Sequence, residues 1–240
     1  MVQVQKITSF VVFKDPKISI IPKFLSPAEC ASLISIGEEI GFTRSLVGRG
    51  VYGLENSSDS FTNQYSENRT SFSVTLPTDT LPTYTPHTPL HTTLHNIEAR
   101  LCELVQMDIA HLESLVLVKY EPRQKFGLHH DGKFRKFTVF IYLNEPPTEE
   151  FVAVETDSDG HLLAKVDTCA ATCAETGGET FFSNISLKIK PHTGTAVLWE
   201  NNISPGIDNP KTVHEGIPPV GWTKYGVNCF FNDQVMRQYA

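Results

Sequence analysis

The second half of the chain is a succession of short apolar segments separated by turns, and this pattern limits the fold more than any other feature of the sequence. Each segment has the length of a β-strand, and proline, glycine and asparagine occur between the segments. The segments are residues 115–120, 137–143, 179–182, 195–199 and 225–231. Many short strands joined by such turns are typical of a β-sandwich or barrel, so we expect a mostly β fold in this half.

The first half of the chain favours helices. Residues 26–29, Ser-Pro-Ala-Glu, form the pattern of a helix start, and apolar residues follow at helical spacing as far as Gly41. A second helical stripe of apolar residues occupies residues 92–107. Residues 48–89 are rich in Gly, Ser, Thr, Asn and Pro and predict irregular surface loops. The combination predicts an α+β chain in which N-terminal helices support a β core.

Length and charge limit the organisation and the partners. The 240 residues fit one domain, in which we expect residues 1–112 to be the helical and loop support and residues 113–240 to be the core. The net charge of −7 argues against binding nucleic acid through bulk charge. The first 23 residues contain no long apolar run, so we expect no signal peptide and no membrane span, and a cytoplasmic or nuclear protein.

A polar stretch at residues 149–176 interrupts the core pattern and predicts an inserted hairpin. It contains Cys169 and Cys173, two of five cysteines. Two loop thiols are the simpler interpretation of this pair, and a local disulfide or metal clip is the alternative. Because the number of cysteines is odd and low, we do not expect a framework of disulfides to hold the fold together.

The sequence His129-His130-Asp131 carries the first chemical signal. In an extended segment, side chains two positions apart point the same way, so His129 and Asp131 would converge while His130 would point away. His130 as ligand in place of His129 is a minor alternative. One imidazole and one carboxylate are two ligands of a 2-His-1-carboxylate site, which suits the oxygen chemistry of Fe(II).

The third ligand must come from a later strand, and His161, His192 and His214 are the candidates. His214 has the best context, because it follows a polar loop and precedes a strand. Ten residues later Lys224 opens that strand, on the same face as Gly226 and Asn228. A lysine facing a barrel interior is costly unless an anion pairs with it, and a dicarboxylate co-substrate would supply the anion.

Two further side chains are candidate hydrogen-bond donors to that anion. Tyr120 lies on the strand that precedes the His129 motif, nine residues earlier. Thr180 follows the Gly177-Gly178 turn.

With these motifs in place, the chain resembles the prolyl 4-hydroxylase branch of the 2-oxoglutarate, iron(II)-dependent dioxygenases. The resemblance is carried by His129, Asp131, His214 and Lys224 in family order, and by five further segments. These segments are Phe-Leu-Ser-Pro-Ala-Glu-Cys at 24–30, Asn-Arg-Thr-Ser at 68–71, Val-Lys-Tyr-Glu-Pro at 118–122, Ile-Tyr-Leu-Asn at 141–144 and Gly-Gly-Glu-Thr-Phe-Phe at 177–182.

The resemblance implies a double-stranded β-helix, or jelly roll, with supporting N-terminal helices. It implies Fe(II) at His129, Asp131 and His214, and 2-oxoglutarate with its far carboxylate at Lys224, helped by Tyr120 and Thr180. O2 would be the oxidant, with ascorbate as a further candidate cofactor. The products would be a hydroxylated substrate, succinate and CO2.

The resemblance also bears on the substrate. Relatives hydroxylate peptidyl proline, free amino acids or other small molecules, and the Arg69 segment lies on the substrate side, so Arg69 is a candidate contact to a small-molecule or peptide substrate. The chain departs from the family pattern in the insertion at 149–176. It also departs at 215–219, where Glu-Gly-Ile-Pro-Pro replaces a stretch similar to Cys-Pro-Val.

Other functions for the same residues are a non-catalytic protein that keeps the barrel and a cupin-type metal enzyme that uses no 2-oxoglutarate. A cupin-type enzyme needs no partner for a far carboxylate, so Lys224 and Tyr120 favour the oxygenase. A structural zinc site would close four ligands, often thiolates, whereas this pattern offers three.

Overall fold

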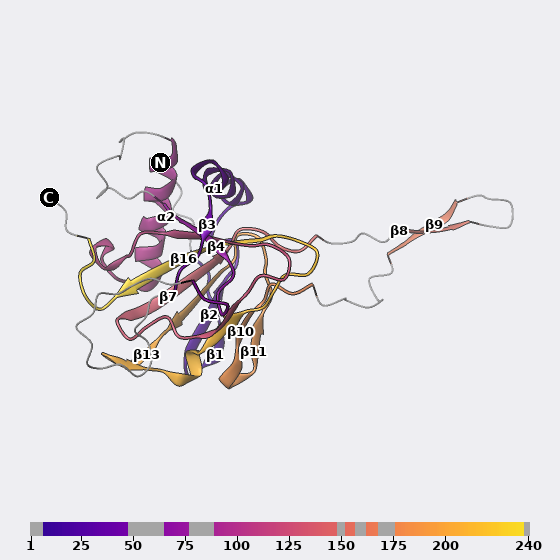
Figure 1. The fold of residues 1–240 in the computed structure, drawn as a ribbon. Helices are drawn as coiled ribbons and strands as arrows, with labels where there is room; N and C mark the ends of the chain where they lie inside the picture. Colours follow the sequence, from indigo (N-terminus) through magenta and orange to yellow (C-terminus); the bar gives the residue numbers. More distant parts are fainter. Residues whose placement is uncertain are drawn as a thin grey trace.

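The computed structural model describes residues 7–47, 65–76, 89–147, 152–156, 162–167 and 176–237. These residues form two antiparallel β-sheets that face one another, with two helices beside the larger sheet (Figure 1). The larger sheet has the strand order β1-β2-β12-β7-β16-β5-β4-β3, and the smaller has the order β11-β10-β15-β6. The mostly β fold predicted from the strand pattern is confirmed.

The strands of the larger sheet are β1 (Phe10–Lys14), β2 (Lys17–Ile21), β3 (Thr43–Arg44), β4 (Phe72–Thr75), β5 (Val116–Tyr120), β7 (Arg135–Tyr142), β12 (Ala196–Glu200) and β16 (Lys224–Asn232). The strands of the smaller sheet are β6 (Phe126–His129), β10 (Thr180–Phe182), β11 (Leu187–Ile189) and β15 (His214–Gly216). A rim hairpin consists of β13 (Asn202–Ser204) and β14 (Ile207–Asp208), and the short 3-10 helices are η1 (Ile109–His111), η2 (Ser183–Ile185) and η3 (Pro210–Thr212).

The chain passes repeatedly from one sheet to the other. It runs from β5 in the larger sheet to β6 in the smaller, back to β7, then to β10 and β11, to β12, to β15 and finally to β16. This alternation is the double-stranded β-helix, or jelly roll, that the resemblance implied. Its consequence for function is that β6 and β15, far apart in sequence, lie side by side in the smaller sheet.

The two faces of the larger sheet have different partners because side chains alternate along each strand. On β7, Val139 and Ile141 point to the outer face and belong to the cluster that includes the helices. Phe140 and Tyr142 point to the inner face and pack with residues of the smaller sheet. The space between the sheets is therefore lined by every second residue of the core strands.

The helices α1 (Pro27–Ile40) and α2 (Pro89–Val105) bury their apolar stripes against the outer face. Helix α1 begins with the predicted capping box, in which Ser26 and Glu29 bond to each other's backbone N–H. Leu33, Ile97 and Leu101 are fully buried, and each such side chain contributes about 1.5–3 kcal/mol relative to an exposed one. The helices thus stabilise the sheet from the side opposite to its inner face.

The expectation of irregular loops throughout residues 48–89 is wrong in part. Strand β4 lies in this range and pairs with β5, and β3 pairs with β4. The four residues of β4 gain their partners from a strand more than forty positions later in the sequence, so local composition did not indicate them. The rest of the range at 48–64 and 77–88 lies outside the described residues.

The insertion contains the predicted hairpin. Strands β8 (Val152–Thr156) and β9 (Leu162–Asp167) pair antiparallel in a two-stranded sheet of their own, drawn apart from the two larger sheets in Figure 1. His161, Cys169 and Cys173 lie outside the described residues.

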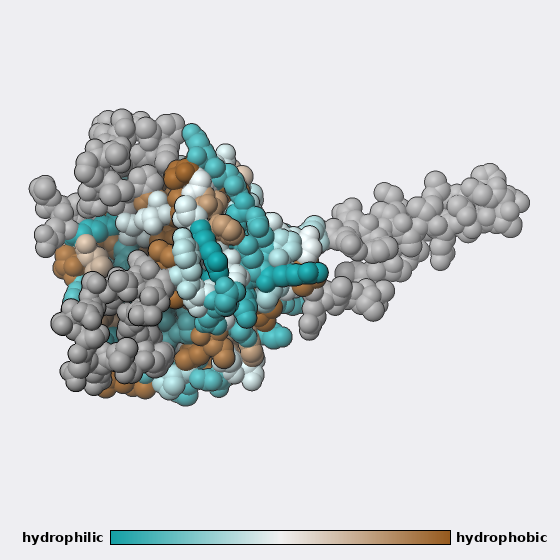
Figure 2. Space-filling view, in the orientation of Figure 1, coloured by the Kyte–Doolittle hydropathy of each residue, from teal (hydrophilic) through white to brown (hydrophobic). Residues whose placement is uncertain are grey.

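Among the described residues no helix has both the length and the apolar character needed to cross a membrane. Figure 2 shows polar and apolar residues interspersed over the visible face of the described part.

Candidate active site

A cavity of about 540 Å³ lies between the two sheets. Its wall includes each residue singled out from the sequence: His129, Asp131, His214, Lys224, Tyr120, Thr180 and Arg69. The structure therefore brings together side chains that are up to 155 positions apart, from Arg69 to Lys224, in one cavity.

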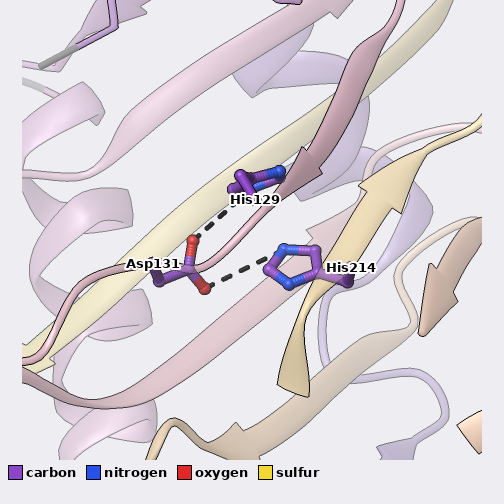
Figure 3. A group of neighbouring side chains, drawn as sticks. All are labelled: His129, Asp131 and His214. Atoms are coloured by element: carbon purple, nitrogen blue, oxygen red, sulfur yellow. Dashed lines mark ion pairs between the residues drawn. The ribbon is translucent and has the colours of Figure 1, made fainter. Parts of the chain in front are cut away.

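Three of these residues form a cluster of metal-ligating type. His129 ends β6, His214 begins β15, and the two are directly paired across the smaller sheet. Asp131 follows β6 by two residues, and its carboxylate lies between the two rings (Figure 3). The Oδ1 atom is 3.7 Å from His129 Nε2, and the Oδ2 atom is 3.9 Å from His214 Nε2.

The backbone fixes which nitrogen each imidazole presents. His129 Nδ1 donates to the carbonyl of Gly127 at 2.8 Å, and His214 Nδ1 donates to the carbonyl of Thr212 at 2.9 Å. Because a carbonyl only accepts, the hydrogen of each neutral ring must be on Nδ1. Both Nε2 lone pairs are therefore free for a metal, and the ligand atoms of the cluster lie within 4.8 Å of one another.

The protonation states also suit a cation. Burial, together with the neighbouring His214, lowers the pKa of His129 to about 3, so this ring is neutral near pH 7. Burial raises the pKa of Asp131, but His214, His129 and the Thr138 hydroxyl outweigh it and hold the pKa below the ordinary value. Two imidazoles and one carboxylate are the donor set of a 2-His-1-carboxylate iron site, so the residues present fit Fe(II).

Lys224 lies deep in the same cavity, with 2% of its surface exposed. Its Nζ lies 5.3 Å, 5.0 Å and 5.2 Å from the ring centres of Tyr120, Phe140 and Tyr142. No described carboxylate forms an ion pair with this nitrogen, and burial lowers the pKa of Lys224 to about 7. Three ring faces stabilise the cation in part, and an anion entering the cavity would complete its surroundings.

Two hydroxyls lie beside this cation. Tyr120 is paired with Lys224 across β5 and β16 and is buried. Thr180 is also buried, and its Oγ1 is 2.7 Å from the Tyr142 hydroxyl. The lining of the cavity therefore combines one ammonium with hydroxyl groups, a set that matches a carboxylate.

Arg69 occupies another part of the wall. Its guanidinium lies 4.5 Å from the ring centre of Phe126, and that ring stacks on His129 with centroids 3.5 Å apart. Its hydrogen bonds go to the Leu46 carbonyl at 3.1 Å and to the Ser71 hydroxyl at 3.4 Å. No described carboxylate lies within ion-pair distance of its guanidinium, although Asp131 interacts with it electrostatically.

The other described histidine candidates do not join the triad. His130 points away from the triad, because its Nε2 bonds to the Asn201 carbonyl at 3.0 Å and lies 3.1 Å from the Thr212 hydroxyl. His192 is exposed at the surface, 3.3 Å from Glu145 Oε2.

The sequence analysis missed three inward-facing residues of β7, namely Thr138, Phe140 and Tyr142. They alternate along one strand, so the period-two pattern of residues 135–142 contained the signal that they share the inner face of the sheet, where Thr138 and Phe140 line the cavity. Thr138 matters most for the triad, since its hydroxyl donates to Asp131 Oδ2 at 2.6 Å. Arg135 also contacts the loop that carries Asp131, because its Nη1 donates to the Asp131 carbonyl at 3.2 Å.

The chain is similar to known proteins in sequence and in fold. Residues 115–232 match the 2OG-Fe(II) oxygenase superfamily. A putative prolyl 4-hydroxylase of Acanthamoeba polyphaga mimivirus is 28% identical over 152 residues, which are 56% of this chain and 50% of that protein. The chain thus matches about half the length of this curated relative.

Solved structures share the fold at lower identity. The viral collagen prolyl hydroxylase vCPH from Paramecium Bursaria Chlorella virus-1, in complex with 2OG, superposes with a TM-score of 0.58 and 20% identity, covering 89% of this chain and 94% of that one. A Trichoplax adhaerens prolyl hydroxylase in complex with a peptide fragment of the hypoxia inducible factor oxygen degradation domain has a TM-score of 0.60 and 14% identity, covering 92% and 85%. The matched region spans the strands that carry the triad and Lys224, so residues 115–232 belong to the 2OG-Fe(II) oxygenase superfamily, and the chain is similar in sequence and fold to prolyl hydroxylases.

Proposed function

We propose that the protein is a 2-oxoglutarate- and Fe(II)-dependent dioxygenase that hydroxylates an unactivated C–H bond of a prolyl residue, an amino acid or another small molecule. In the overall reaction one atom of O2 enters the substrate as a hydroxyl group and the other enters succinate, while 2-oxoglutarate loses CO2. One observation carries the proposal. A metal-ligating triad and an unpaired, buried lysine line the same cavity.

In this proposal His129, Asp131 and His214 hold the metal, and Fe(II) when bound supplies the C–H oxidation chemistry. The chain's own residues bind and orient the co-substrate. Lys224 pairs with the far carboxylate of 2-oxoglutarate, and Tyr120 and Thr180 are the candidate hydrogen-bond donors beside it. The surrounding rings exclude water from this ion pair, which strengthens its electrostatic attraction.

The cations of the cavity also bear on the substrate. Lys224 would be neutralised by the co-substrate, whereas Arg69 would still lack an anion. Its guanidinium lies over the Phe126 ring, and its Nε and Nη1 atoms bond to Ser71 and Leu46, so Nη2 is the nitrogen that we expect to hydrogen-bond a ligand. We assign to Arg69 a contact with a carboxylate or main-chain carbonyl of the substrate.

The experiment is an anaerobic titration of the metal-free protein with Fe(II) and then with 2-oxoglutarate, followed through the visible charge-transfer band of the chelate. We expect the band with the unaltered protein and with His192→Ala, whose ring is at the surface. We expect no band after His129→Ala, Asp131→Ala or His214→Ala. Lys224→Ala should weaken 2-oxoglutarate binding far more than it weakens Fe(II) binding.

A second readout separates the oxygenase from a 2-oxoglutarate-independent metal protein of the same fold. Release of succinate on admission of O2 is expected of an oxygenase. Iron binding without a band and without succinate would overturn the proposal and favour the metal-binding jelly-roll alternative.

A further inference from the structure

A chain of hydrogen bonds runs from the barrel core to the metal triad. Trp199 Nε1 donates to Asn201 Oδ1 at 2.8 Å, and Asn201 Nδ2 donates to Thr138 Oγ1 at 2.8 Å. Thr138 Oγ1 in turn donates to Asp131 Oδ2 at 2.6 Å. We refer to Trp199, Asn201 and Thr138 as the Asp131 support chain.

The direction of these bonds follows from the chemistry of the groups. An indole N–H only donates, so the amide oxygen of Asn201 must face Trp199 and its NH2 group must face Thr138. The Thr138 oxygen accepts that bond, and its own hydrogen is then free to point at Asp131. An ionised carboxylate only accepts, so every link has one donor and one acceptor.

The support chain is rigidly placed. Trp199, Asn201 and Thr138 are buried, with at most 1% of their surface exposed. The backbone of Asn201 is held on both sides, since its N–H donates to the Lys136 carbonyl at 2.9 Å and its carbonyl accepts from Asn209 at 2.8 Å. Buried and fully bonded side chains of this kind have little freedom to move the carboxylate that they hold.

From this geometry we infer that Thr138 is a positioning residue that binds Oδ2 of Asp131 and thereby leaves Oδ1 alone to ligate the metal. The inference rests on the proposed function. A carboxylate that used both oxygens would occupy one more coordination position. Fe(II) held by His129, Asp131 and His214 would need its remaining positions for 2-oxoglutarate and O2, so a second Asp131 oxygen would compete with them.

The test uses substitutions that differ by one hydroxyl. Thr138→Val removes the donor with little change in size, and Thr138→Ser restores it. Thr195→Val is the matched control, because Thr195 is a buried threonine outside the cavity. Melting temperatures of the metal-free proteins show that each variant folds.

Two quantities are measured under anaerobic conditions: the affinity for Fe(II), and the spin-3/2 electron paramagnetic resonance signal when nitric oxide is added to the Fe(II) and 2-oxoglutarate complex. Nitric oxide needs the same open position as O2. We expect Thr138→Val to bind Fe(II) about tenfold to a hundredfold more weakly, as is typical when a partner of a metal ligand is lost. At saturating iron we expect its nitrosyl signal to fall several-fold, with Thr138→Ser and Thr195→Val unchanged.

Unaltered affinity and signal in Thr138→Val would overturn the inference. Weaker iron binding with a full nitrosyl signal would contradict the inference that Asp131 ligates the metal through one oxygen only. A folded Thr138→Val that holds no iron, with recovery in Thr138→Ser, would support the inference. Failure of the unaltered protein to bind iron is a different result, because it removes the proposed function itself.

Discussion

The Nζ atom of Lys224 lies 5.0 Å from the centre of the Phe140 ring, and no described carboxylate forms an ion pair with it. Burial lowers the pKa of Lys224 to about 7, so the ammonium form predominates below pH 7 and is lost above it. Binding of a carboxylate favours the charged form, and 2-oxoglutarate binding above pH 7 must therefore take up a proton.

The first prediction concerns this linkage. We expect the affinity for 2-oxoglutarate to be constant below pH 7 and to fall by up to tenfold for each pH unit above it. Calorimetry at pH 8 with Mn(II) in place of Fe(II), in two buffers of different ionisation enthalpy, should show uptake of close to one proton. Lys224→Arg keeps its charge at all these pH values and should show no uptake. An affinity of the unaltered protein that is flat from pH 6 to pH 9 would contradict the role of this lysine.

The second prediction concerns the wall behind Lys224. A Cβ atom at Gly226 would lie 2.4 Å from Phe140 Cζ, so Gly226→Ala must displace the ring that borders the ammonium. We expect a loss of about 1–3 kcal/mol in the free energy of unfolding, as for other overpacked cores, measured by urea denaturation. We also expect weaker 2-oxoglutarate binding at unchanged Fe(II) affinity.

Gly216→Ala is the control for this substitution. It adds the same methyl group to the cavity wall, but its nearest neighbour would be the Tyr120 hydroxyl at 3.7 Å. Equal losses of stability in the two variants would show that the contact with Phe140 is not the cause.

The third prediction concerns the loop that carries Asp131. Arg135 forms two hydrogen bonds of 2.8 Å with the carboxylate of Glu113 and donates to the Asp131 carbonyl. Both side chains of the pair are partly exposed, so we expect Glu113→Gln to cost only about 1–2 kcal/mol of unfolding free energy. Because the loop loses a fixed partner, Fe(II) affinity should also fall, by several-fold. Glu121→Gln, which alters a more exposed carboxylate, should change neither quantity, and unchanged Fe(II) affinity in Glu113→Gln would count against this role of the pair.

The fourth prediction concerns Arg69. If its guanidinium meets the substrate, Arg69→Lys should lower substrate-stimulated succinate formation at least tenfold, because lysine lacks the planar group that stacks on Phe126. Slow succinate formation without substrate should remain, since Lys224 and the triad are intact. Arg44→Lys alters an arginine paired with Glu67 and serves as the control. An equal loss of both activities in Arg69→Lys would assign the residue to the metal or co-substrate site instead.

Much of the site followed from local pattern. The period of two along an extended chain was enough to predict that His129 and Asp131 converge and that Lys224 shares a face with Gly226 and Asn228. The helix start at Ser26 was equally local, because both partners of the capping box lie within four residues.

What could not be predicted depends on pairing between distant strands. The direct pairing of His129 with His214 joins positions 85 residues apart, and no local signal encodes its register. Strand β4 was missed for the same reason. The bond from Asn201, directly after β12, to Thr138 in β7 joins positions 63 residues apart, and it can be recognised only when β12 and β7 are aligned.

The two triad histidines share one local arrangement, in which each ring donates from Nδ1 to the carbonyl of the residue two positions earlier. Every amino acid has a backbone carbonyl, so at position 212 this orientation does not depend on which side chain is present. The path of the backbone thus determines which nitrogen of each ring carries the proton. Variants that reshape the cavity to accept a different substrate can therefore retain the metal-facing nitrogens, provided that the path of β6 and of the turn before β15 is preserved.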